Sequence, residues 1–104
     1  MGNIVRGTTP LIRYTFNSIT VTDITTAYLV LKQGGNAVIT KTLDDCTVGN
    51  GFLDWILEQE DTLALCDRRP CEICLDWLLN DGTRGVGRTA QVGVSNPAKN
   101  EVIE

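Results

Sequence analysis

The chain has 104 residues, of which 42% are hydrophobic, 21% charged and 6% aromatic, and this balance is typical of one globular domain. Its formal net charge of -4 excludes the strongly basic surface that nucleic-acid phosphates require. Histidine is absent, which removes the commonest general base and every Ser-His or Cys-His nucleophile pair. We therefore expect no nucleic-acid partner, no enzymatic activity and no cofactor.

Apolar residues recur mostly at every second position, which is the period of a β-strand. Residues 11–16 alternate after Pro10 and predict a first half-buried strand. Residues 26–32 predict a second strand, and Gly34-Gly35-Asn36 predicts a tight turn into a returning strand over residues 37–43. The first half of the chain is therefore expected to contain a lone strand and a hairpin.

The second half continues this pattern with one interruption. Residues 52–57 predict a strand, and residues 58–65 predict one or two helical turns because they begin with acidic residues and then show helical spacing. Residues 70–79 have the clearest alternation in the chain and predict a central strand. The turn sequence Asn80-Asp81-Gly82-Thr83 follows it. An antiparallel partner is expected next, ending at Asn96-Pro97, with one face formed by Val86, Arg88, Ala90, Val92 and Val94.

These elements predict an all-β fold: one antiparallel β-sandwich of immunoglobulin-like type, with one short helical turn, spanning residues 1–104. A small barrel is the alternative. The segments outside the predicted strands are an N-terminal arm, Met1 to Thr9, and a C-terminal tail, Ala98 to Glu104. The predicted core contains Ile12, Tyr14, Phe16, Leu29, Leu31, Leu53, Trp55, Leu57, Ile73, Leu75, Trp77, Val92 and Val94.

The four cysteines are the first candidates for chemistry. Cys66, Cys71 and Cys74 have the C-x4-C-x2-C spacing of plant-type two-iron ferredoxins, and with Cys46 they are candidate ligands for an iron-sulfur cluster or zinc. The pattern places its fourth ligand downstream, whereas Cys46 lies upstream, and a strand turns Cys71 and Cys74 to opposite faces. A thioredoxin-like site would need Cys71 and Cys74 to lie at the start of a helix, whereas the apolar alternation predicts a strand there. We therefore favour the interpretation that the cysteines are small core residues, and we expect no metal. A disulfide between Cys66 and Cys71, or between Cys46 and Cys74, remains an open alternative.

Other candidate motifs have simpler structural explanations. The acidic groups Asp44-Asp45 and 58–61 lack the alternating ligands and glycine of a calcium loop. Ser18 and Ser95 have no G-x-S-x-G context, and the glycine-containing segment 82–88 lacks the ending of a phosphate loop. The tryptophans, on apolar strand faces, are expected to be core anchors rather than ligand-stacking groups. No residue is therefore assigned a catalytic role.

Targeting signals are not evident either. The first residues contain no basic segment followed by an apolar stretch, and no apolar run approaches the ~20 residues of a membrane span. Arg6 stands where a myristoylation signal requires serine or threonine after Gly2. We therefore expect no secretory signal and no membrane partner.

Five segments, taken together and in order, resemble small proteins of phages and prophages from gut bacteria: residues 4–10, 27–35, 41–45, 57–63 and 80–83. Such proteins are similar to the immunoglobulin-like N-terminal domains of baseplate upper proteins and to head-decoration or head-fibre components. The resemblance implies a structural protein of a tailed bacteriophage virion, made in the host cytoplasm.

The resemblance also implies partners and an alternative role. Other capsid, neck, tail or baseplate proteins would be the partners, and the protein would form a homo-oligomer. The interface candidates lie outside the predicted strands: Ile4, Val5, Arg6, Thr8, Thr9, Val102 and Ile103. The alternative is a displayed adhesion or carbohydrate-binding module in which Tyr28, Trp55 or Trp77 stacks on sugars.

Overall fold

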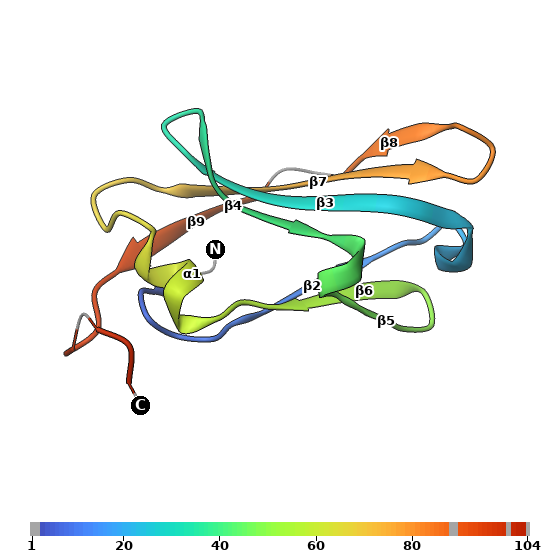
Figure 1. The fold of residues 1–104 in the computed structure, drawn as a ribbon. Helices are drawn as coiled ribbons and strands as arrows, with labels where there is room; N and C mark the ends of the chain where they lie inside the picture. The colour runs from blue at the N-terminus through green and yellow to red at the C-terminus, as the bar shows by residue number, and fades with distance from the viewer. Residues whose placement is uncertain (1–2, 88–89, 100, 104) are drawn as a thin grey trace.

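A computed structural model describes residues 3–87, 90–99 and 101–103 and shows two β-sheets packed face to face (Figure 1). The all-β sandwich expected from the sequence is confirmed. The elements are β1 (Asn3–Val5), β2 (Leu11–Thr15), β3 (Ile24–Gln33), β4 (Asn36–Thr42), β5 (Thr47–Val48), β6 (Phe52–Ile56), α1 (Gln59–Leu63), β7 (Cys71–Leu79), β8 (Arg84–Val86) and β9 (Ala90–Ser95), with 3-10 turns over Val21–Asp23 and Leu43–Asp45.

The large sheet has the strand order β1-β9-β7-β3-β4, with β8 also paired to β7, and the small sheet has the order β2-β6-β5. The order β2-β6-β5 matches strands B-E-D, and the order β9-β7-β3-β4 matches strands G-F-C-C′, of a variable-type immunoglobulin sandwich. The disulfide that joins strands B and F in antibody domains has no counterpart, because β2 contains no cysteine. Side-chain packing between the sheets takes its place.

The hairpin between β3 and β4 follows directly from its turn residues. Gly34 and Gly35 both have positive φ, +60° and +81°, which suits a two-residue turn between strands with right-handed twist. The strands predicted over residues 11–16, 26–32, 37–43, 52–57 and 70–79 correspond to β2, β3, β4, β6 and β7. Strong period-2 segments bounded by turn residues were therefore predicted well.

The prediction of one unbroken strand from Val86 to Val94 is wrong. Val86 pairs with Asp76, whereas Ala90 pairs with Ile73, so the second ladder is shifted by one residue relative to the first. A one-residue shift exchanges the two faces. Val86 consequently points outward and is 64% exposed, while Val94 lies in the core. Arg88, which was predicted on the same face, lies outside the described residues.

The prediction that Met1 to Thr9 form an arm outside the strands is also wrong, because residues 3–5 form β1. This strand pairs with β9 in parallel, with Ile4 opposite Val94, so the sheets are not entirely antiparallel. Ile4 is only 6% exposed and belongs to the core. A three-residue strand with one inward side chain has no periodicity to detect, and for that reason the alternation missed it. The predicted tail contains no strand over residues 98–99 and 101–103.

Most of the predicted core is confirmed. Phe16, Leu29, Leu31, Leu53, Trp55, Leu57, Leu75, Trp77 and Val94 are buried, whereas Ile12, Tyr14, Ile73 and Val92 are only partly buried against them. Tyr14, Phe16 and Trp77 form an aromatic cluster with ring centroids 4.8–5.9 Å apart, which is the range favoured by tilted and edge-on pairs. This cluster joins β2 to β7 and places the two sheets relative to each other.

Candidate functional site

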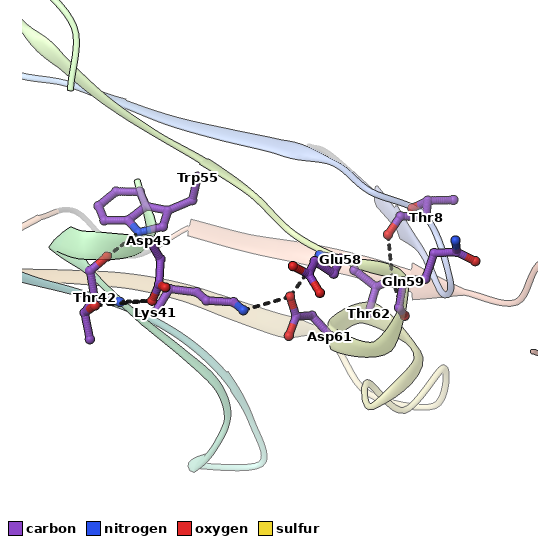
Figure 2. Close-up of polar contacts among 9 residues, drawn as sticks. All are labelled: Thr8, Lys41, Thr42, Asp45, Trp55, Glu58, Gln59, Asp61 and Thr62. Carbon is purple, nitrogen blue, oxygen red and sulfur yellow. Dashed lines mark hydrogen bonds and ion pairs between the residues drawn. The ribbon is translucent and has the colours of Figure 1, made fainter. Parts of the chain in front are cut away.

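The side of the sandwich next to β4 is closed by a polar network (Figure 2). Lys41 projects from β4 toward α1, where its Nζ lies 3.0 Å from Oδ2 of Asp61. Trp55 Nε1 donates to the carbonyl oxygen of Thr42 at 2.9 Å. The hydrogen bond with Asp61 raises the pKa of Lys41, and the negative charges of Asp61, Asp45 and Glu58 add to this effect. The network therefore links the large sheet to both β6 and α1.

The acidic groups singled out in the sequence belong to this network. The amide of Thr42 donates to Asp45 at 2.9 Å, and the amide of Glu58 donates to Asp61 at 2.9 Å, so that each carboxylate caps a helical turn. The hydrogen bond from the backbone of Thr42 lowers the pKa of Asp45. Among residues 3–87, 90–99 and 101–103, no cluster of three or more carboxylates or thiols could hold a metal ion. Capping of a turn and of a helix start therefore accounts for the positions of Asp45 and Asp61.

The cysteines lie in four different environments. Cys71 is buried on the inward face of β7, and Cys74 lies half-buried on the outward face, as the strand period predicts. Cys46 is half-buried, Cys66 is exposed, and no disulfide joins any of the four. Burial raises the pKa of Cys71 to about 11, and burial likewise raises the pKa of Cys46. Both thiols are thus protonated near neutral pH, which disfavours their use as nucleophiles or metal ligands.

The predicted N-terminal interface residues are largely used inside the domain. Arg6 donates from its amide to the carbonyl oxygen of Ser95 and from its guanidinium to the carbonyl oxygen of Leu63, at 2.9 and 2.8 Å. The carbonyl oxygen of Thr8 accepts a hydrogen bond from the fully buried Thr62 at 2.8 Å. Val5 is half-buried within β1, and Thr9 is exposed. A detachable arm does not fit these contacts.

The C-terminal interface residues are more accessible. Ile103 is 67% exposed, and Val102 is also exposed. Two hydrogen bonds connect the backbone of Ile103 to the Gln59 side chain, one donated by the Ile103 amide at 2.7 Å and one accepted by its carbonyl oxygen at 3.1 Å. The tail is thereby held against α1 while its apolar side chains stay exposed.

Three exposed apolar residues lie on the outward face of the large sheet, and we call Tyr28, Leu78 and Val86 the outer patch. They come from three neighbouring strands, β3, β7 and β8, and are 45%, 39% and 64% exposed. Between them, Asp76 lies directly opposite both Tyr28 and Val86 and accepts a hydrogen bond from Arg84 at 2.9 Å. A shallow depression of about 350 Å³ is lined by Thr26, Tyr28, Asp76, Trp77, Leu78 and Arg84.

Sequence reasoning named Tyr28 but missed Leu78 and Val86 as surface residues. A usable signal was present for Leu78, because it stands at an outward position in the alternation of β7. Val86 carried no such signal, since the one-residue shift after it reverses the faces. The tryptophans proposed for sugar stacking are core residues: Trp55 is 1% exposed and Trp77 is 9% exposed. Tyr28 alone among the three candidates offers an exposed aromatic ring.

No protein-family model matches this chain, and no curated protein matches it at a significant level. Within the described residues, no helix is long and apolar enough to cross a membrane.

Proposed function

We propose that this chain is a structural component of a tailed bacteriophage virion, either a head-decoration or head-fibre protein or a tail or baseplate protein. It acts by contacts with other virion proteins and catalyses no reaction. It is made in the host cytoplasm, assembles as a homo-oligomer and stays in the particle. Support for this origin comes from the resemblance of five segments to small phage proteins.

The observation that carries the assembly role is the outer patch. Single exposed apolar residues are ordinary, but three large ones on neighbouring strands, arranged around the Asp76–Arg84 ion pair, form a surface that a partner can cover. The Asp76–Arg84 ion pair within the patch offers polar groups to a partner. Tyrosine and arginine, both present in this patch, are enriched in protein–protein interfaces.

The first test is mass spectrometry of purified phage particles, with the copy number of this chain compared with that of the major capsid protein. A copy number close to that of the capsid protein would support a head-decoration or tail-tube role. A much smaller number would support a baseplate, neck or fibre role. Absence from the particles would overturn the proposal.

The second test separates the outer patch from the rest of the surface. Val86→Lys introduces a charge at the patch, and Val48→Lys introduces the same charge on β5, where the valine is 51% exposed. Both variants should fold, because neither residue belongs to the buried core. We expect Val86→Lys to be lost from the particles and Val48→Lys to be incorporated normally. Equal incorporation of both would remove the outer patch from the proposal.

A displayed carbohydrate-binding module is the second candidate, and the position of Tyr28 favours it. The tyrosine is 45% exposed beside the shallow depression, where Asp76 and Arg84 could hydrogen-bond to sugar hydroxyls. Titration with host-surface glycans, followed by NMR, would test it. Shifts of the Tyr28 ring signals that Tyr28→Ala abolishes would support this role over assembly alone.

A further inference from the structure

The outer edge of β2 is a free edge of the small sheet. The ladder between β2 and β6 uses the even-numbered residues of β2, since Leu57 donates to the Pro10 carbonyl oxygen and Phe16 donates to that of Gly51. In an antiparallel pair the intervening residues direct their amides and carbonyls to the other side. Leu11, Arg13 and Thr15 thus present their backbone groups outward, and no other part of the described chain bonds to these groups.

Several other sheet edges are short or partly blocked. On β4, the amide of Thr42 is bonded to Asp45 and its carbonyl oxygen is bonded to Trp55. On β1, the carbonyl oxygen of Val5 accepts hydrogen bonds from the amide and the hydroxyl of Thr8. The β5 strand has only two residues. Proteins usually protect edges in such ways; on β2 the one charged side chain, Arg13, is held in an ion pair with Asp54 of β6, and the outward backbone groups have no partner among the described residues.

The large sheet extends beyond this edge. Across the sandwich, Trp55 of β6 reaches Thr42 of β4, and Tyr14 of β2 contacts Trp77 of β7. The position next to β2 therefore faces β9, which follows β7 in the large sheet.

The part of β9 that this position faces is incompletely covered. Ala90 lies on the inward face, opposite Ile73, but it is exposed, and Val92 is only half-buried. A strand added beside β2 would cover both. Ala90 and Val92 thus form an incompletely covered apolar surface beside the free edge of β2, and we call these two residues the shelf.

We propose that the edge of β2 binds an extended segment of another protein by β-strand addition. The backbone of the segment pairs with Leu11, Arg13 and Thr15, and its alternate side chains are apolar and pack on Ala90 and Val92. On the outward face, Leu11 and Ile56 lie opposite each other and are 54% and 66% exposed, so an apolar side chain there extends an existing apolar row. This inference goes beyond the proposed function, because it concerns a second surface and its test needs no phage particle.

A second copy of this chain fits the edge poorly. Antiparallel pairing of two β2 strands would place both large sheets on the same side of the joined small sheets. Each large sheet continues past β2 with β9 and β1, so the two β9 strands would need the same space. A lone extended segment has no such second layer.

The test uses the full chain and a short capped peptide that alternates threonine and valine. Amide hydrogen exchange, followed by NMR, reports directly on the outward amides. We expect exchange at Leu11, Arg13 and Thr15 to slow at least about tenfold when the peptide is added. A peptide of the same composition with its valines consecutive should give less protection. Unchanged exchange, or protection at Thr40 of β4 instead, would overturn the inference.

Two variant pairs make the test specific. Thr15→Pro removes one outward donor without removing a ladder bond, and Thr15→Ala keeps that donor. Ala90→Glu places a charge on the shelf, and Gln91→Glu places it on the opposite face of β9. We expect Thr15→Pro and Ala90→Glu to abolish peptide protection and their partners to retain it. Protection that arises without peptide and grows with protein concentration would assign the edge to a second copy and overturn the proposal.

Discussion

The indole Nε1 of Trp55, in the small sheet, donates a hydrogen bond of 2.9 Å to the carbonyl oxygen of Thr42, at the end of β4 in the large sheet. This bond crosses from one layer of the sandwich to the other at a point where the side chain is 1% exposed. It also occupies a backbone acceptor on an edge strand that would otherwise be open. The Trp55 side chain thus fills the core, holds the two sheets together and protects the edge of β4 at Thr42.

Replacing Trp55 with phenylalanine should destabilise the domain through lost volume and through the unsatisfied Thr42 carbonyl. Trp77→Phe is the matched control, because the indole of Trp77 is also in the core but donates no hydrogen bond that we identify within the described residues. We expect Trp55→Phe to lower the free energy of unfolding by about 1 kcal/mol more than Trp77→Phe. Urea denaturation measures both, and equal losses would contradict a role for the hydrogen bond.

The Lys41–Asp61 ion pair should stabilise the domain in a pH-dependent way. Asp61 raises the pKa of Lys41 in the folded state, so this stabilisation is fully present below the unfolded pKa of about 10.4 and is lost as pH rises through the folded value. Lys41→Met should cost about 1 kcal/mol at neutral pH, because both side chains are about four-fifths buried.

Stability curves in urea at increasing pH would test this expectation. The difference between wild type and Lys41→Met should shrink above pH ~10. Arg84→Met removes the more exposed ion pair with Asp76 and should change stability little. A constant difference up to high pH would show that the lysine acts by packing alone.

Ile4 should be required for stability, although it stands near the start of the chain. Ile4→Ala removes a side chain that is 6% exposed and should cost about 2–4 kcal/mol. Ile103→Ala is the matched control, because that isoleucine is 67% exposed, and its effect should stay within about 0.5 kcal/mol. Thermal or urea unfolding of both variants decides between a strand that belongs to the core and a dispensable arm.

The cysteines should differ sharply in reactivity. Cys66 is exposed, whereas Cys71 is buried and its pKa is raised to about 11. With iodoacetamide near neutral pH, Cys66 should be alkylated at least about a hundredfold faster than Cys71, because the thiolate is the reactive form. Peptide mass mapping over time gives both rates. Urea should bring the two rates together, and equal rates in the native protein would contradict the buried position of Cys71.

The sequence predicted the elements whose periodicity is long and whose turns carry their own chemistry. The β7 strand alternates over nine residues, and the β3–β4 turn contains two glycines, so both were placed well. The one-residue shift between the pairings of Val86 and Ala90 was not predictable from alternation, because it depends on which residues of β7 each segment pairs with. A single inward residue, Ile4, likewise gives no pattern in β1.

The candidate surfaces were harder to predict than the fold. Exposure of Tyr28, Leu78 and Val86 depends on which sheet face remains uncovered, and that is set by the pairing of distant strands. The free edge of β2 depends on which strands pair elsewhere in residues 3–87 and 90–99, and no local sequence feature encodes that. The acidic capping residues Asp45 and Asp61 were correctly attributed to turn and helix-start chemistry, because that chemistry is local.

The parallel pairing of β1 with β9 determines how the domain responds to mechanical force. Asn3 pairs with Gly93 and Val5 pairs with Ser95, so the chain enters β1 at one end of this pair and leaves β9 at the other. Pulling on the two ends of the chain therefore slides the strands past each other and loads their hydrogen bonds together rather than one after another. The parallel arrangement of these two strands therefore favours resistance to stretching along the line between them over unzipping one bond at a time.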